Sequence, residues 1–219
     1  MICDIIMYYE TKERGMRIVT LYPGSWGSNC YILQSGSHAA VVDPSPRADQ
    51  ILNVLEQNGA TLDFILLTHG HFDHIVSIDS LRASTGAPVL IHEADAEFPA
   101  DSRKNAFYYF FHMDQSYQAP DRSLKSDEVL TLGEETIRVI HTPGHTAGSV
   151  CYLCNNDFLL TGDTIFDVGR GRTDLYGGNE ATLLQTLRNM RTLPQSLPIY
   201  PGHGTQATLG TALDQALAF

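Results

Sequence analysis

The chain has 219 residues, of which 43% are hydrophobic and 18% are charged. This composition is typical of a globular protein with one domain or two small ones, and it excludes disordered and fibrous classes. The formal net charge of −11 argues against a nucleic-acid partner, because an acidic surface repels phosphodiester groups. No apolar run reaches the roughly 18–20 residues needed to cross a bilayer. We therefore expect neither a nucleic acid nor a membrane as a partner.

The first fifteen residues lack the basic start, the long apolar core and the small-residue cleavage site of a secretory signal. Their absence favours a cytoplasmic location. We expect residues 1–15 to be a loosely attached tail or a short extra strand, and residues 16–219 to form a single domain. The four cysteines do not make a disulfide scaffold in a chain of this length. Cys151 and Cys154 fall on one predicted strand, where their side chains face opposite sides of a sheet.

Short apolar runs alternate along the chain with segments of helical periodicity. Strands are predicted at residues 17–22, 29–34, 39–43, 64–68, 89–92, 137–141, 149–154 and 158–161. Helices are predicted at 46–59, 180–193 and 208–219, where large apolar residues recur on one face. This order of elements indicates an α/β protein in which helices cover sheets.

The segment 98–117 carries five consecutive aromatic residues, from Phe107 to Phe111, followed by His112. Helices that face solvent rarely carry such a run. The segment either packs back on the edge of a sheet or forms a lid whose rings line a substrate cleft. In a lid, Tyr108 and His112 are the candidate substrate contacts.

Histidine and aspartate are concentrated directly after the strand predicted at 64–68. His69, His71, Asp73 and His74 lie within six residues of one another. Imidazole nitrogen and carboxylate oxygen are ligands that zinc, iron and manganese accept. Alternate side chains on a turn can point the same way, so His69 and His71 can bind one ion while Asp73 and His74 face a second.

Three later turns, each after a predicted strand, carry the same residue types. His145 lies in the turn 142–149, Asp163 follows the strand at 158–161, and His203 lies in a glycine-rich turn. Glycine in these turns lets the backbone approach an ion closely. Each turn alone is a weak signal, but together with the first motif they indicate a metal centre.

In order and approximate spacing these seven residues resemble those of the metallo-β-lactamase-fold hydrolases, and the resemblance extends over most of residues 16–205. It implies an αββα sandwich with its metal site at the edge of the two sheets. It also implies two divalent ions per chain, zinc in the first place, with iron or manganese as alternatives. The implied ligands are His69, His71 and His145 for the first ion, Asp73, His74 and His203 for the second, and Asp163 bridging both.

The other polar residues near these motifs have simpler expected roles. Asp43 follows a strand and is expected to orient a metal-bound histidine rather than to bind metal itself. His38 is expected to be solvated in a hairpin turn. His92 and His141, at strand ends, are expected to cap or pack.

The strings at 142–149, 171–174 and 200–204 are most similar to glyoxalase II, and more closely to its small bacterial relatives. This similarity implies hydrolysis of a hydroxyacyl thioester of glutathione by a metal-bridging hydroxide, with Asp73 as the catalytic residue that fixes it and accepts its proton. Full-size glyoxalase II continues past its last metal histidine with a helical region that contacts glutathione, whereas 16 residues follow His203 here. The thiol part of the substrate therefore stays open, and Arg170 and Arg172 are candidates to bind its carboxylate.

Two alternatives within the same fold remain open at this point. Persulfide dioxygenases share the string at 171–174 and hold a single Fe(II) with residues that match His69, His145 and Asp163. A lactonase or another ester hydrolase is the second alternative. The sequence keeps all seven ligands in every case and does not distinguish them. We expect a small-molecule thioester or ester substrate and a monomer or homodimer.

Overall fold

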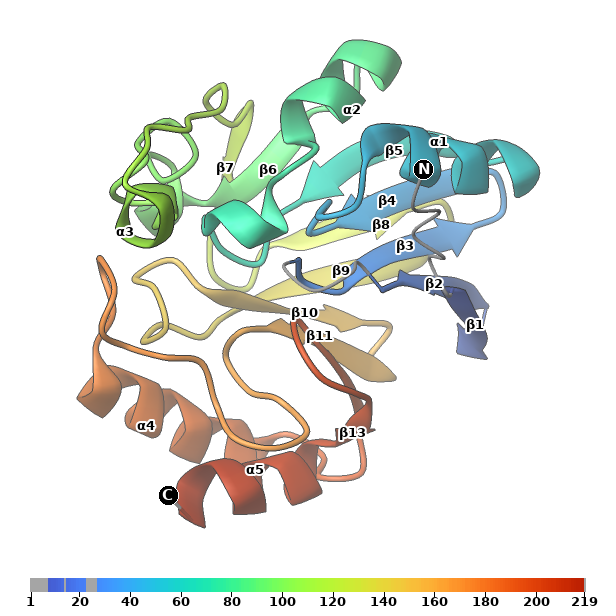
Figure 1. The fold of residues 1–219 in the computed structure, drawn as a ribbon. Helices are drawn as coiled ribbons and strands as arrows, with labels where there is room; N and C mark the ends of the chain where they lie inside the picture. The colour runs from blue at the N-terminus through green and yellow to red at the C-terminus, as the bar shows by residue number, and fades with distance from the viewer. Residues whose placement is uncertain (1–7, 14, 23–26, 219) are drawn as a thin grey trace.

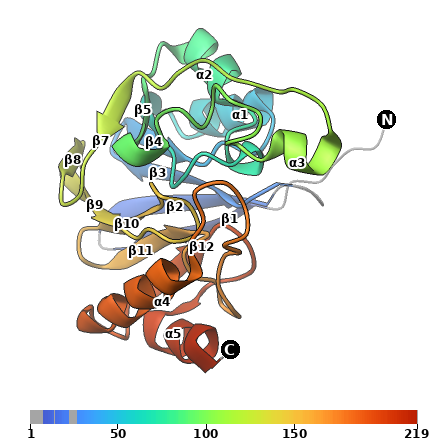
Figure 2. The ribbon, with the colours of Figure 1, turned by 90° about the vertical axis from the view of Figure 1, so that its left-hand side faces the viewer.

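The computed structural model describes residues 8–13, 15–22 and 27–218. Within them, two β-sheets pack face to face and helices cover the outer face of each sheet (Figures 1 and 2). One sheet has the strand order β1-β2-β3-β4-β5-β6-β7, and the other has the order β13-β12-β11-β10-β9-β8. This architecture confirms the predicted αββα sandwich.

The first sheet is antiparallel from β1 to β4 and parallel from β4 to β7. Helices α1 (Ala48–Gln57) and α2 (Ile78–Thr85) make the crossovers that parallel pairing requires. The short helix α3 (Phe107–Phe111) precedes β7. The strands are β1 (Tyr8–Glu13), β2 (Met16–Leu21), β3 (Cys30–Ser35), β4 (His38–Val42), β5 (Thr61–Leu66), β6 (Val89–His92) and β7 (Arg122–Leu124).

The second sheet is antiparallel except for the pair β11 and β12. Helix α4 (Glu180–Asn189) forms the crossover of that pair, and α5 (Leu209–Ala218) follows the last strand. The strands are β8 (Val129–Leu132), β9 (Glu135–His141), β10 (Val150–Cys154), β11 (Phe158–Gly162), β12 (Pro198–Pro201) and β13 (Ala207–Thr208). Three single turns of 3-10 helix complete the elements: η1 (Phe72–His74), η2 (Glu93–Asp95) and η3 (Met190–Thr192).

Apolar side chains form three layers, one between the sheets and one beneath each pair of helices. The alternation along β10 shows how one strand serves two layers: Cys154 lies between the sheets, whereas Cys151 packs under α4 and α5. The opposite orientation predicted for these two thiols is thus confirmed, and both are free. Burial raises the pKa of Cys151 to about 11, which keeps this thiol protonated and inert.

All eight predicted strands and all three predicted helices have counterparts in the structure. The structure adds the helices α2 and α3 and the strands β7, β8, β12 and β13. It also contains β1, which agrees with the extra strand, one of the two alternatives expected for residues 1–15. Strand β1 pairs antiparallel with β2, while residues 1–7 lie outside the described part of the chain, as does residue 219 at the end of the last predicted helix. No helix within the described ranges has the length and apolar character needed to span a bilayer.

Candidate metal centre

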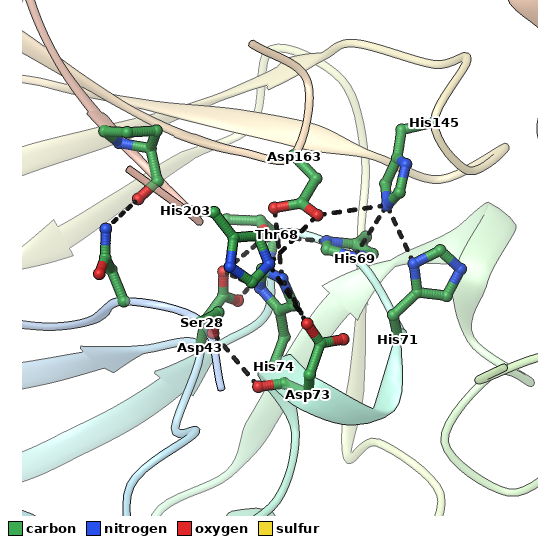
Figure 3. Close-up of polar contacts among 12 residues, drawn as sticks. Ser28, Asp43, Thr68, His69, His71, Asp73, His74, His145, Asp163 and His203 are labelled. Atoms are coloured by element: carbon green, nitrogen blue, oxygen red, sulfur yellow. Dashed lines mark hydrogen bonds and ion pairs between the residues drawn. The ribbon is translucent and has the colours of Figure 1, made fainter. Parts of the chain in front are cut away.

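Four loops carry the seven predicted ligands to one point at the edge of the sandwich (Figure 3). His69 and His71 lie in the loop after β5, and Asp73 and His74 lie in η1, which that loop enters directly. The other three come from the loops after β9, β11 and β12, namely His145, Asp163 and His203. In Figure 3 these side chains point toward one another from opposite sheets.

The first group of potential ligands consists of His69, His71 and His145, all nearly inaccessible to solvent. His71 Nδ1 lies 2.9 Å from His145 Nε2, and His145 Nε2 lies 3.2 Å from His69 Nε2. Three ring nitrogens from two loops therefore converge on one point. Such convergence is what a tetrahedral cation site requires of its histidines.

The second group consists of Asp73, His74 and His203. His203 Nε2 lies 3.2 Å from Asp73 Oδ2, and His74 Nε2 lies 3.8 Å from the same oxygen. Asp163 lies between the two groups, because its Oδ1 is 3.3 Å from His74 Nε2 and its Oδ2 is 3.7 Å from His145 Nε2.

Buried polar atoms without partners show that the cluster fits a divalent cation. His74 Nε2 and Asp163 Oδ1 are buried, and neither has a hydrogen-bond partner among the described residues. Unsatisfied polar atoms in the interior are costly, so their pairing at one point indicates a ligand between them. Gly202 completes the cradle, since a Cβ there would lie 2.3 Å from Asp163 Oδ1.

Burial and charge prepare the side chains as ligands. Burial lowers the pKa of His69, and burial together with His145 lowers the pKa of His71 to about 3, so both imidazoles are neutral. Burial acts in the same direction on His74, but the carboxylates of Asp163 and Asp73 outweigh it and raise the pKa. Burial alone would raise the pKa of Asp163, but the neighbouring histidines lower it, so this carboxylate is ionised. Neutral imidazole and ionised carboxylate are the forms that bind metal. His69, His71 and Asp163 are therefore already in the binding form, whereas His74 would release a proton when an ion binds.

Asp43 occupies the position predicted for it, beside His74 and behind the ligand cluster. Its Oδ2 accepts hydrogen bonds from His74 Nδ1 at 2.9 Å and from Thr68 Oγ1 at 2.7 Å. Its backbone φ of 52° is rare for a residue other than glycine, and such strain is typical of functional sites. These contacts fix the His74 ring with Nε2 directed at the cluster.

Sequence reasoning missed two groups that orient the ligands. Thr68 binds Asp43 through both its N–H and its hydroxyl, and it also contacts His69 Nδ1 at 3.1 Å. His145 Nδ1 donates to the carbonyl of Arg172 at 2.7 Å, which directs Nε2 inward. The threonine directly before the histidine motif was a visible signal, whereas a backbone carbonyl leaves none.

A cavity of about 350 Å³ opens onto the cluster. Apolar side chains form much of its wall: Phe72, Ala106, Phe110, Phe166 and Leu175. Of the four predicted substrate contacts, only Arg172 lines it. Arg170 instead binds the Ala216 carbonyl and Glu180, while Tyr108 and His112 lie outside the cavity lining. A larger cavity of about 630 Å³ between β9 and α4 is lined by none of the seven residues.

The aromatic run of α3 packs against the metal loop. The Phe72 ring, between His71 and Asp73 in sequence, contacts Phe107, Phe110 and Phe111 with ring centroids 5.5–5.7 Å apart. The rings therefore pack on the protein and, through Phe110, also line the cavity. A lid function for 98–117 stays a prediction.

An αββα sandwich with a histidine and aspartate cluster at its edge defines a class of metal-dependent hydrolases. The family model of the Metallo-beta-lactamase superfamily matches residues 23–203, and the chain belongs to this superfamily. Its members bind divalent metals, in agreement with the donor set described above.

Two sequence relatives extend the comparison. The chain is 34% identical to the probable metallo-hydrolase YqgX of Bacillus subtilis, over 86% of this chain and 90% of that protein. It is also 34% identical to the hydroxyacylglutathione hydrolase of Bartonella henselae, over 78% of this chain. The match spans 59% of the length of that second relative.

Two solved structures agree with the fold. The crystal structure of the BLEG-1 B3 metallo-β-lactamase has a TM-score of 0.83 and 33% identity, covering 89% of this chain and 95% of that one. The structure of TTHA1623 in a di-iron-bound form has a TM-score of 0.80 and 26% identity, covering 91% of this chain and 99% of that one. Together with the family match, they support a metal-dependent hydrolase.

Proposed function

We propose that the protein is a two-metal hydrolase that cleaves thioesters of the hydroxyacylglutathione type. The position of Asp163 carries the proposal, because its carboxylate lies within 4 Å of donors from both groups. Its Oδ2 is 3.7 Å from His145 Nε2 of the first group and 3.6 Å from His203 Nε2 of the second, and its Oδ1 is 3.3 Å from His74 Nε2. A bridging carboxylate of this kind is suited to a pair of ions rather than to one. The hydroxyacylglutathione hydrolase of Bartonella henselae, at 34% identity, supports the choice of thioester.

Two divalent ions held by the seven residues would supply Lewis acidity and a hydroxide at neutral pH. Asp73 lines the cavity and has a partly exposed side chain, so its carboxylate is placed to orient the attacking oxygen and to accept its proton. A thiolate leaves readily, because the pKa of a cysteine-like thiol is about 8.5. The site therefore needs no separate general acid.

The apolar wall of the cavity has its own role in this reaction. Phe72, Phe110 and Phe166 would exclude water from the acyl group, while the metal ligands form the polar part of the cavity lining. Arg172 stands at the wall with its guanidinium bound to Asp174 and its charged plane 5.5 Å from the centre of the Phe110 ring. It is the candidate cation for a carboxylate of the thiol part.

Steady-state kinetics on a panel of small thioesters tests the proposal, with the metal content of the same sample measured. We expect turnover of S-D-lactoylglutathione, because the metal chemistry acts on the thioester carbonyl. We expect KM to depend on Arg172, the predicted substrate contact that lines the cavity. The absence of turnover of every thioester by fully metallated protein, with rapid turnover of a lactone, a β-lactam or a persulfide, would overturn the assignment. Oxygen uptake with glutathione persulfide identifies the dioxygenase alternative.

A further inference from the structure

Asp95 is a fully buried carboxylate outside the seven-residue cluster. It ends η2, directly after β6, and none of its surface is accessible to solvent. Its Oδ1 accepts a hydrogen bond from the N–H of Gly148 at 2.7 Å. Its Oδ2 accepts from the Thr146 hydroxyl at 2.6 Å and from the N–H of Gly70 at 3.3 Å. Within the described ranges, no lysine or arginine forms an ion pair with it.

These three bonds join the two loops that carry the first ligand group. Gly70 lies between His69 and His71 in sequence, and Thr146 directly follows His145. The loops are more than 70 residues apart in the chain and come from different sheets. Asp95 therefore connects the loop of His71 with the loop of His145. The ring nitrogens His71 Nδ1 and His145 Nε2 lie 2.9 Å apart.

The contacts require a carboxylate at this position. Both oxygens accept, whereas an asparagine amide would turn its NH₂ group toward a backbone or hydroxyl donor. Burial raises the pKa of Asp95 to about 6, which shows that holding this group in the interior has a cost. A neutral apolar residue would avoid that cost but would leave two buried N–H groups without acceptors.

The surrounding packing leaves the two loops little room to shift. A Cβ at Gly148 would lie 2.6 Å from Cγ of Asp95, and a Cβ at Gly70 would lie 2.2 Å from Cβ of Phe98. Both glycines thus abut the segment from Asp95 to Phe98. This segment holds the two loops together both through hydrogen bonds and through close contact.

We propose that Asp95 is a positioning residue for the first metal group, which fixes the distance of His145 from His69 and His71 and so retains the ion bound there. Asp43 acts in the corresponding way on His74, on the other side of the cluster. The inference rests on the two-ion centre proposed above and is independent of the thioester substrate.

Release of metal from the holoprotein to a chromophoric chelator tests this role. In the Asp95→Asn variant, we expect one of two release phases to be about 10–100-fold faster than in the parent, the usual cost of losing a partner of a metal ligand. The other phase should stay within about twofold of the parent rate. His203→Ala removes a ligand of the second group only, so the release phase that it accelerates identifies the ion of the second group. Asp95→Asn should accelerate the other phase, which belongs to the ion of the first group. Hydrogen exchange at the Gly70 and Gly148 amides should also accelerate in Asp95→Asn.

Two further variants separate positioning from general stability. Leu55→Ala opens a cavity beneath α1 at a residue that belongs to neither loop, and it should lower the melting temperature while leaving release near the parent rate. Thr146→Val removes one of the three donors and should accelerate the same phase by about threefold to tenfold, a change expected for a single hydrogen bond. If Asp95→Asn does not fold, Thr146→Val decides the question.

Three results would overturn the role of Asp95. They are metal release from Asp95→Asn at the parent rate, equal acceleration of both of its release phases, and release from Leu55→Ala as fast as from Asp95→Asn. A holoprotein that carries one ion would refute the two-ion centre instead. In that case the single release rate, compared among the same variants, still decides whether Asp95 positions the ligands.

Discussion

The two halves of the metal centre use similar residues but differ in their exposure to solvent. His69, His71 and His145 of the first half are 1%, 4% and 2% exposed. In the second half His74 is also buried, but the side chains of Asp73 and His203 are 21% and 41% exposed. Both halves line the cavity, the first through His71 and His145 and the second through Asp73 and His203. Similar ligands therefore occupy two different environments a few ångströms apart.

This difference in exposure indicates that the two halves of the metal centre have different roles. The buried half is held by protein contacts, such as the bond from His145 Nδ1 to the Arg172 carbonyl. Asp73 and His203 of the other, more exposed half line the cavity with partly exposed side chains, whereas His71 and His145 line it but are nearly inaccessible to solvent. We infer that the buried half provides affinity for metal and the exposed half provides access to substrate.

The substitution of Asp163, which belongs to both halves, should have the largest effect. Asp163→Ala removes the one carboxylate that faces both groups, so we expect kcat/KM to fall by at least about 100-fold, above the cost of losing a residue that only orients a ligand. Asp73→Ala, which affects the exposed half, should cost less. Kinetics with parallel elemental analysis checks this order, and a greater loss in Asp73→Ala would contradict it.

Removal of metal by a chelator should expose the asymmetry directly. The ion at the exposed half should leave first, because the side chains of His203 and Asp73 are partly accessible to solvent and to the chelator. Elemental analysis after stepwise dialysis should pass through a species with one ion per chain, and His203→Ala should be isolated in that state. Loss of both ions in a single step would show that the two halves behave as one site.

At the mouth of the cavity, Arg172→Ala should have a moderate effect on KM alone. The guanidinium is paired with Asp174 in an exposed position, where an ionic contact with substrate contributes only modestly to binding. Its removal should therefore raise KM by about fivefold with kcat almost unchanged. The matched variant Arg170→Ala, at a side chain that does not line the cavity, should leave KM at the parent value. A fall in kcat for Arg172→Ala would mean that this residue contributes to the chemical step rather than to substrate binding.

The smallest effect is expected at His38, which lies outside both halves. Its exposed ring pairs with Asp63 on the surface, so His38→Ala should leave kcat/KM within about twofold of the parent. Loss of activity comparable to that of Asp163→Ala would mean that the site has been drawn incorrectly.

Much of this protein could be predicted from its sequence. The alternation of strands and helices predicted the α/β class, and the resemblance predicted the sandwich. The seven polar residues could be grouped because their order and spacing resemble those of the metallo-β-lactamase-fold hydrolases and because each lies in a turn that follows a strand. Asp43 could be placed for the same reason.

Contacts between distant segments escaped prediction. The sequence left open whether residues 1–15 form a tail or an extra strand, because β1 has no apolar alternation and is defined by its pairing with β2. The role of Asp95 depends on two loops that come together only in the folded chain, and nothing local distinguishes it from Glu93. Arg170 and Arg172 are two residues apart in one loop, yet only the second faces the cavity.

The sequence by itself determined which residues gather at the centre, because motif and strand order are local properties of the chain. Only the tertiary structure decided which of them are buried. His71 and His203 both lie in glycine-containing turns after strands and both line the cavity, yet His71 is buried and the side chain of His203 is 41% exposed. Exposure depends on the packing of segments far apart in sequence, and no local pattern encodes that packing.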